Sequence, residues 1–350
     1  MKVLVAIDSL KGCLSSADAN HAAAEGIKIA CPTAEVVEFP VSDGGEGWLE
    51  AYQATVGHQE QNEIVEVPVC DPLMRIVRAK YLIVGQTAII EIAQACGLGR
   101  IKPEERNPII ASSYGVGQLI SNAISHGCRH FIIGLGGSGT SDAGRGMLEA
   151  MTNIPDGLQF TIATDVSNPL CGQQGAATVF GPQKGATPEM IIILEERARQ
   201  FAQENARRMG FDCSTRPGSG AAGGLGYAFM QFFHAQSLSG ADLLLKTYHF
   251  DEQLKTCELV LTGEGRADRQ TLMGKLPYHI LLHAQAFNVP CHLLAGDIKD
   301  RESLLAAGFA KVHDINPPTL PLSQALLPDV ARRQISHASA TLALKALSRC

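Results

Sequence analysis

The 350-residue sequence contains no apolar run that reaches the roughly 18 residues needed to span a membrane. Its first residues, MKVLVAIDS, hold only about five apolar residues before Asp8, too few for the core of a secretory signal. The 29 Lys and Arg are scattered along a chain of net charge −6, so no basic patch for nucleic acid or anionic lipid is expected. We therefore expect a cytoplasmic protein whose partners are small molecules, with no nucleic acid and no membrane.

The ten cysteines form neither a C-x-x-C pair nor a closely spaced framework. Cysteines spaced this way are typical of reduced, mostly buried thiols in a reducing compartment. This pattern agrees with the cytoplasmic expectation.

Several common catalytic motifs are absent as well. There is no G-x-x-x-x-G-K-[ST] loop and no G-x-G-x-x-G turn that opens a helix, which excludes a P-loop and a Rossmann dinucleotide site. No G-x-S-x-G is present, and Cys171 has no neighbouring histidine in sequence, so acyl transfer is not expected. The pairs His126/His130 and His279/His283 have helical spacing, but neither fits a zinc motif.

The length suggests two domains, since single cores stop growing near ~250 to 300 residues. At the amino terminus, strands over residues 3–7 and 35–41 flank a helix that starts with Ser15 and Asp18 at capping-box spacing. Near the carboxyl terminus, three more strands alternate with helices. We predict one doubly wound parallel sheet, in a discontinuous domain of residues 1–56 and 255–350.

Residues 57–254 are predicted to form an inserted, mixed α/β domain. EIVEVPV and RIVRAKYLIV are expected to pair antiparallel around Asp71, with TAIIEIA following at hairpin distance. A helix near 112–125 and strands at 130–135 and 159–164 come next. The longest helix is predicted to start at Thr187 and to stop at Gly210.

Four turns at predicted strand ends combine glycine with an acid, and ligands bind at the carboxyl ends of strands in α/β sheets. The four turns are residues 8–12, 43–47, 136–142 and 263–268. A fifth segment, PGSGAAGGLGYAF at 217–229, runs into an apolar helix. Its amides either cradle an anion or allow close packing, and the sequence leaves both readings open.

Carboxylates, glycine loops and isolated basic residues together are what phosphoryl transfer requires. Acids hold Mg²⁺, a cation meets the charge on the moving phosphoryl group, and backbone amides position the phosphates. The basic candidates are Lys11, Lys184, Arg266 and Lys275. For any one lysine, a solvated surface position is the competing interpretation.

Eight motifs in order over nearly the whole chain resemble the bacterial glycerate kinase family, of the type that makes 2-phosphoglycerate. They are DSLKGCLSS, SDGGEGW, PEERNPIIASSYGVGQLI, GLGGSGTSDAGRGML, ATDVSNPLCG, VFGPQKGATPEM, GSGAAGGLG and LTGEGRADRQTLMGK. The resemblance implies ATP- and Mg²⁺-dependent phosphorylation of (R)-glycerate. It also implies a flavodoxin-like α/β domain and an unrelated mixed α/β domain, with the active site in the cleft between them.

The candidate site residues follow from these motifs and from the chemistry of their side chains. The catalytic candidates are Lys11, Asp43, Asp142, Asp165 and Glu264, and the metal candidates are Asp43, Asp142 and Asp165. The substrate-binding candidates are Asp8, Ser9, Glu46, Asn168, Arg266 and Lys275. The cofactor-binding candidates are Gly136, Gly137, Ser138, Gly223 and Gly224. Glu46 also has a purely structural interpretation, as an acid in the first turn of a helix.

The sequence departs from the family pattern in three places. The common S-A-T-N-D-G-G is SGTSDAG at residues 138–144, with Ser141 in place of Asn, and D-V-D-N-P is DVSNP at 165–169. Between G-M-L and that motif, family members carry a few dozen residues, whereas only EAMTNIPDGLQFTIAT is present here.

Three alternatives stay open at this point. One is a kinase that forms 3-phosphoglycerate, and another is a degenerate protein that binds glycerate or a nucleotide without catalysis. A sugar-phosphate isomerase is disfavoured because the acidic turns repel a preformed phosphate. The sequence also leaves open a homodimer.

Overall fold

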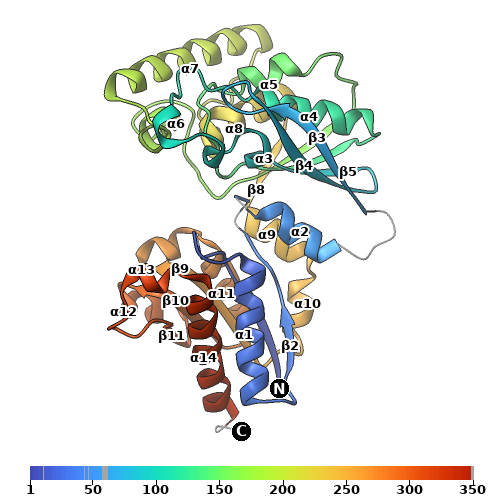
Figure 1. Cartoon of the computed structure of the whole chain (residues 1–350). Coiled ribbons are helices and arrows are strands. Elements are labelled where there is room, and N and C mark those ends of the chain that lie inside the picture. The colour runs from blue at the N-terminus through green and yellow to red at the C-terminus, as the bar shows by residue number, and fades with distance from the viewer. Residues whose placement is uncertain (11, 43, 46, 57–61, 348–350) are drawn as a thin grey trace. The chain divides into compact units, whose positions relative to one another are not determined.

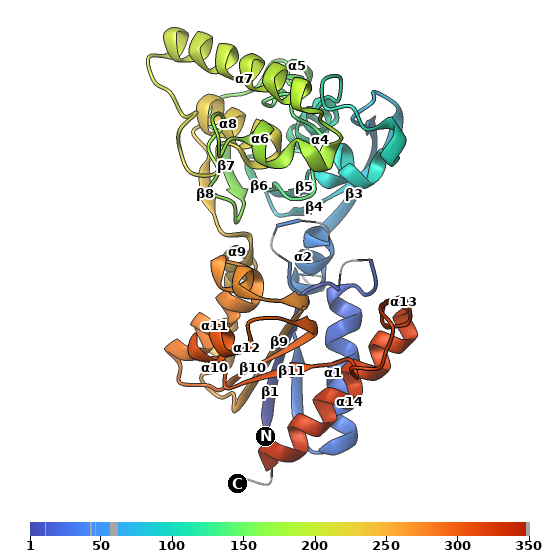
Figure 2. The same ribbon diagram turned by 90° about the vertical axis from the view of Figure 1, so that its left-hand side faces the viewer.

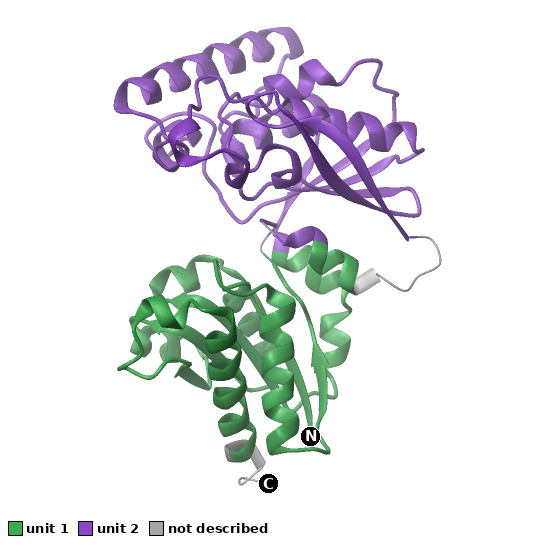
Figure 3. Ribbon diagram, viewed as in Figure 1, with its two compact units in different colours: residues 1–42, 50–55, 241–350 green, residues 43–49, 56–240 purple. Residues whose placement is uncertain are grey.

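The computed structural model describes all residues except 11, 43, 46, 57–61 and 348–350 (Figure 1). The chain divides into two compact units, Met1–Ser42 with Glu50–Thr55 and Ala241–Cys350 as unit 1, and Asp43–Leu49 with Val56–Gly240 as unit 2 (Figure 3). Each unit contains one β-sheet with helices, which confirms the predicted α/β class. The domain limits predicted at residues 56 and 254 stay a proposal.

The sheet of unit 1 is entirely parallel, in the order β11-β10-β9-β1-β2. Its strands are β1 (Lys2–Ile7), β2 (Glu35–Glu38), β9 (Leu259–Ala267), β10 (Cys291–Ile298) and β11 (Lys311–Asp314). Counted within the unit, this is the 2-1-3-4-5 order of flavodoxin-like folds. The two ends of the chain therefore share one sheet, as the sequence predicts.

Apolar strands that are buried on both faces need helices on both sides. Helices α1 and α14 lie on one face of the sheet and α11 on the other (Figure 2). The helices are α1 (Ser16–Ala30), α2 (Trp48–Val56), α9 (Gly240–Thr247), α10 (Phe250–Leu254), η4 (Arg269–Met273), α11 (Leu276–Ala286), α12 (Arg301–Ala306), α13 (Leu322–Ala325) and α14 (Pro328–Leu347). Ser15 caps α1 by accepting from Asp18 N at 3.1 Å, which confirms the predicted cap.

Helices α1 and α14 pack so closely that one glycine has no room for a side chain. A Cβ on Gly26 would lie 2.8 Å from Cα of Ser336 and still closer to its carbonyl oxygen. We expect Gly26→Ala to destabilise the protein by about 3 kcal/mol, because overpacking against backbone outweighs the helix propensity of alanine. Urea denaturation measures this, with Gly99→Ala as control, since nothing lies within 4 Å of that position. A stabilised Gly26→Ala variant would contradict the packing described.

Two histidines of α11 connect this helix to α9 and α10. His279 Nδ1 lies 2.7 Å from Oδ1 of Asp242, and His283 Nδ1 lies 2.5 Å from Oδ1 of Asp251. Its hydrogen bond with Asp242 raises the pKa of His283, and the hydrogen bonds from His279 and His283 lower the pKa of Asp242. His279 and His283 thus hold α11 against α9 and α10 through Asp242 and Asp251, and we call these four residues the His-Asp clamp.

The clamp makes stability depend on pH. A raised histidine pKa contributes stability that is complete below the unfolded value of about 6.5 and is lost as the pH rises through the raised value. The lowered Asp242 pKa contributes above about pH 4. We expect Asp242→Asn to lower the free energy of unfolding by about 1 kcal/mol at pH 5.5 and by much less at pH 9. Thermal denaturation at both pH values measures this, and equal losses would contradict the clamp.

The sheet of unit 2 is mixed, in the order β3-β4-β5-β6-β7-β8. Its strands are β3 (Asn62–Cys70), β4 (Ile76–Val84), β5 (Thr87–Glu91), β6 (His130–Gly134), β7 (Gln159–Ala163) and β8 (Gln236–Leu238). The first three pair antiparallel, as predicted, and the others pair parallel. Strand β8 is not predicted from the sequence. Asp71 builds the turn between β3 and β4, since its Oδ1 accepts from Leu73 N and Arg75 N.

Most helices of unit 2 lie on one side of this sheet (Figure 2). The helices of this unit are α3 (Ala93–Cys96), η1 (Leu98–Arg100), η2 (Pro103–Glu105), α4 (Tyr114–Ser125), α5 (Arg145–Ala150), α6 (Ala176–Phe180), η3 (Pro182–Lys184), α7 (Pro188–Met209) and α8 (Ala221–Phe233). The longest, α7, has Thr187 at its N-cap and left-handed Gly210 at its C-cap, which confirms that prediction. Helix α8 contains a kink at residues 222–224 that the sequence does not predict.

Candidate functional site

In unit 2 the glycines of the SDGGEGW motif lie against the loop that follows β6. Gly136 N donates to Gly44 O at 3.0 Å, and a Cβ on Gly136 would overlap Cα of Gly45. Only glycine permits this approach of two backbones. The structure therefore brings together two of the predicted acid-glycine turns, at the carboxyl end of β6. The predicted residues Asp43 and Glu46 lie outside the described residues.

The loop after β6 is held by a buried lysine. Lys184 is 2 % exposed, and its Nζ donates to Ser138 Oγ at 2.9 Å and to Thr140 O at 2.6 Å. Burial lowers the pKa of Lys184 to about 8, although the charge of Asp142 partly opposes this. The ammonium thus fixes the conformation of residues 138–140. Lys184 is one of the four basic candidates for the charge on the moving phosphoryl group, and its signal in the sequence is the motif VFGPQKG.

Asp142, a predicted catalytic and metal residue, is surrounded by donors. Its Oδ2 accepts from Ser113 N, Ser113 Oγ and Gly146 N, and its Oδ1 accepts from Gly144 N, over 2.8 to 3.1 Å. Four hydrogen bonds use most of the acceptor capacity of a carboxylate. Asp142 therefore connects the loop to the start of α4, and its part in catalysis or metal binding stays a prediction.

The predicted glycines of α8 contact the same loop. Ala143 N donates to Gly223 O at 3.0 Å, and a Cβ on Gly224 would lie 2.7 Å from Cα of Ala143. Both glycines have positive φ, at the kink of the helix. Their observed role is close packing, the second of the two readings open from the sequence. A direct contact with phosphate stays a prediction.

The turn after β7 holds two more predicted residues. Asp165 is partly buried two residues beyond the strand, and Asn168 Nδ2 donates to Gln174 O at 2.8 Å. Because β6 and β7 are parallel neighbours, both turns lie at the same edge of the sheet. Asn168 thus shapes its own loop, and substrate binding by either residue stays a prediction.

Glu91, which is not a candidate from the sequence, lies at this edge too. It ends β5, is 2 % exposed, and its Oε2 accepts from Leu49 N at 3.0 Å in the first turn of α2. A carboxylate at a helix amino terminus satisfies an amide and favours the helix dipole. Its sequence signal is an acid that ends the apolar run TAII.

In unit 1 the other candidates gather where β1 and β9 end, the switch point at which doubly wound sheets bind ligands. Asp8 N donates to Gly263 O at 2.9 Å, and Ser9 N donates to Asp8 Oδ1 at 2.7 Å. Asp8 and Ser9 thus follow β1 beside the predicted turn after β9. The predicted residue Lys11 lies outside the described residues.

Glu264 and Lys275 form the central ion pair of this edge. The side chain of Glu264 is 9 % exposed and accepts from Lys275 Nζ at 2.9 Å and from Thr271 Oγ1 at 2.5 Å. Because the carboxylate is buried and held from two sides, it fixes the position of the ammonium, which is 39 % exposed. The structure therefore brings these two predicted residues together.

Arg266, by contrast, is a surface residue. Its side chain is 63 % exposed, with Nε 3.4 Å from Oδ2 of Asp268 and 3.7 Å from Oδ2 of Asp297. Exposed pairs of this kind contribute little to stability. A contact between Arg266 and substrate stays a prediction.

The buried side chain of Asn20 links the strand ends at this edge to helix α1. It is fully buried, its Oδ1 accepts from Ile7 N at 2.9 Å, and its Nδ2 donates to Phe39 O at 3.1 Å and to Ser16 O at 2.8 Å. One side chain thus ties the ends of β1 and β2 to the first turn of α1.

Among the described residues, no group of three His, Cys, Asp or Glu is arranged to hold a metal ion, and no helix is long and apolar enough to cross a membrane. The nine cysteines within the described part have free thiols. Fold and site define the class as a two-unit α/β protein. Each unit carries polar side chains or glycine turns at the carboxyl edge of its parallel strands.

Comparison with known proteins identifies the family. The sequence model of the glycerate kinase family matches residues 3–154 and 151–346, and the chain belongs to this family. The two matched segments overlap at residues 151–154. These residues lie within EAMTNIPDGLQFTIAT, the stretch that is shorter here than in the family pattern.

Relatives over most of the chain carry the same assignment. A glycerate kinase from Bacillus subtilis (strain 168) is 35 % identical and covers 93 % of each chain. The glycerate 2-kinase of Escherichia coli (strain K12) is also 35 % identical and covers 86 % of each chain. A crystal structure of a protein assigned as glycerate kinase 2 from Salmonella typhimurium LT2 matches with a TM-score of 0.83 at 35 % identity over all of both chains.

Proposed function

We propose that this protein is a glycerate 2-kinase, which transfers the γ-phosphoryl group of ATP to a hydroxyl of (R)-glycerate and forms 2-phosphoglycerate. The family and the relatives support this proposal. The structural observation that carries it is the meeting of residues 44–45 with the loop 136–140, which the buried ammonium of Lys184 holds in place. Glycine-rich loops beside a cation are suited to bind phosphates.

In the proposed reaction, the glycerate hydroxyl oxygen bonds to the γ-phosphorus as the bond to the bridging oxygen of ADP breaks, and a carboxylate accepts the hydroxyl proton. Asp43 and Asp165 are the proposed carboxylates for this step and for metal binding. Lys275, fixed by Glu264, is proposed to meet a negative charge of the substrate or of the phosphoryl group.

The residues fit Mg²⁺, because this ion needs only one or two carboxylates and takes its other ligands from phosphates and water. When bound, it neutralises charge on the phosphates. Asp165, partly buried after β7, is the carboxylate that we propose for this task. The proposed partners are thus glycerate, ATP and Mg²⁺, in the cytoplasm and without nucleic acid or membrane; a homodimer stays a prediction.

Omission of single reactants tests the proposal. ADP formation, followed in a coupled assay, is expected only when ATP, Mg²⁺ and (R)-glycerate are all present. A folded protein that forms no ADP from the complete mixture would refute the kinase.

A second candidate is a protein that binds glycerate or nucleotide without catalysis. The segment missing near residues 151–154 favours it, because that break follows α5 and precedes β7 at the candidate site. Calorimetry that detects ligand binding in the absence of turnover would decide for this alternative.

A further inference from the structure

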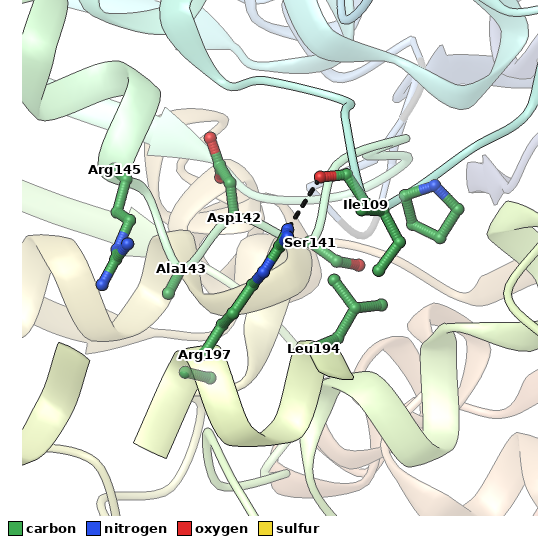
Figure 4. Close-up of a pocket in the computed structure, with 9 residues that line it drawn as sticks. Ile109, Ser141, Asp142, Ala143, Arg145, Leu194 and Arg197 are labelled. Carbon is green, nitrogen blue, oxygen red and sulfur yellow. Dashed lines mark hydrogen bonds between the residues drawn. The ribbon is translucent and has the colours of Figure 1, made fainter. Parts of the chain in front are cut away.

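Unit 2 contains a cavity beside the loop that follows β6. It has a volume of about 130 Å³ and lies between residues 141–143, residues 108–109 and helix α7 (Figure 4). At ~30 Å³ for each water in the liquid, this volume holds about four waters. One small oxyanion of four or five heavy atoms needs similar room.

Two arginines line this cavity. Arg197 Nη1 donates to Ile109 O at 3.0 Å, which is the dashed line in Figure 4. This hydrogen bond fixes the guanidinium at the wall of the cavity. The guanidinium of Arg145 lies 4.5 Å from the ring centre of Phe201. Within the described part of the chain, neither arginine forms an ion pair with a carboxylate. Each therefore keeps donors and a full charge available to a ligand.

Asp142 also lines the cavity, but it does not neutralise these arginines. Its oxygens accept the four hydrogen bonds from Ser113, Gly144 and Gly146 described above. The two positive charges of Arg145 and Arg197 exceed the single negative charge of Asp142 in the lining. The cavity is therefore suited to negative charge.

Ser141 supplies a further donor. Its side chain is 9 % exposed and lines the cavity, and its Oγ is buried with no hydrogen-bond partner among the described residues. A buried hydroxyl without a partner carries a desolvation cost that a ligand can remove. Serine stands here where the family pattern has the larger asparagine, and the smaller side chain leaves room in the cavity.

We propose that this cavity binds a small oxyanion, with a phosphate or carboxylate group held by Arg197 and contacted by the hydroxyl of Ser141, while Arg145 adds positive charge to the lining. Asp142 is the one predicted catalytic residue that lines the cavity, and residues 44–45, Gly136, Ser138 and Asp165 do not line it. The inference goes beyond the kinase function and stands without it.

Titration calorimetry with inorganic phosphate at constant ionic strength tests this site, and millimolar affinity is expected for the unchanged protein. Arg197→Gln is expected to weaken binding at least tenfold, and Ser141→Asn to abolish it by filling the cavity. Arg199→Gln is the matched control, because it removes the same charge from α7 where Arg199 pairs with Glu195 and Glu196 at the surface. That variant is expected to bind like the unchanged protein.

Titration with acetate in place of phosphate distinguishes a carboxylate site from a phosphate site. Binding of phosphate or of acetate that depends on Arg197 supports the proposal. No binding of phosphate or acetate up to 20 mM, on the order of a weak millimolar site, would overturn it. Binding that Arg197→Gln leaves unchanged would overturn it as well. Thermal denaturation confirms that each variant is folded, and Arg197→Met, which also removes the charge, replaces the glutamine variant if that one is not.

Discussion

Replacement of Glu264 by Gln is expected to lower kcat for glycerate phosphorylation by about 100-fold, the scale at which one aligned charge stabilises a transition state. The carboxylate of Glu264 holds Lys275 Nζ at 2.9 Å, and the neutral amide would keep the shape but lose the charge-assisted bond. The ammonium would then no longer be fixed at the carboxyl end of β9. Steady-state kinetics with purified enzyme measure this change.

The matched control removes the same charge near the other end of β9. Glu258 precedes that strand, is 57 % exposed and pairs with the amino terminus, so Glu258→Gln is expected to change kcat less than about threefold. If Glu264→Gln retained normal kcat, the pair with Lys275 would have no part in the reaction.

Replacement of Lys184 by Met is expected to have a comparable effect, a loss of kcat/KM of about 100-fold or more. The buried ammonium donates to Ser138 Oγ and Thr140 O, and methionine leaves both acceptors without a donor. The loop 136–140 then loses the conformation in which Gly136 meets Gly44. Kinetics for ATP and glycerate measure the loss, and Lys80→Met, on the exposed side of β4, serves as the control.

The pKa of Lys184 adds a test by pH. Because the folded value of about 8 is below the usual 10.5, the charge is present at pH 7 and is lost as the pH rises through about 8. Activity that needs this charge is expected to fall between pH 7.5 and 9. Below about pH 8 the buried charge of Lys184 lowers the free energy of unfolding. Between pH 8 and 10.5 this cost is relieved, so the free energy of unfolding is expected to rise while the activity falls. Activity that rises over this range would contradict the role of Lys184.

The sequence predicts most elements because their signals are local. Alternating and apolar runs mark ten of the strands, and Thr187 and Gly210 mark the ends of α7. The exception is β8, whose three exposed residues, Gln236 to Leu238, have neither hydrophobic periodicity nor length. It forms only because β7 offers an edge to pair with.

The candidate site is predictable in part, because a strand-end turn with glycine is visible in sequence but its donors are not. Asp142 is named from its place after Gly139, whereas Ser113, which supplies two of its hydrogen bonds, lies 29 residues earlier. For the same reason Glu91 is not a candidate from the sequence and the contacts of Lys184 are not predicted, since burial against distant backbone decides what both residues do. The sequence pattern shows where the strands end, and only the folded structure shows which acids already accept hydrogen bonds from other residues.

The central claim is that this chain phosphorylates glycerate, and ³¹P NMR of one reaction mixture tests it directly. The protein is incubated with ATP, Mg²⁺ and (R)-glycerate, and the product is identified by its coupling to the glycerate protons. We predict a phosphomonoester coupled to the C2 proton, as in 2-phosphoglycerate, and ADP in equal amount. Coupling to the C3 protons would identify a 3-phosphoglycerate-forming kinase instead, and the absence of any phosphorylated glycerate with folded protein would contradict the account.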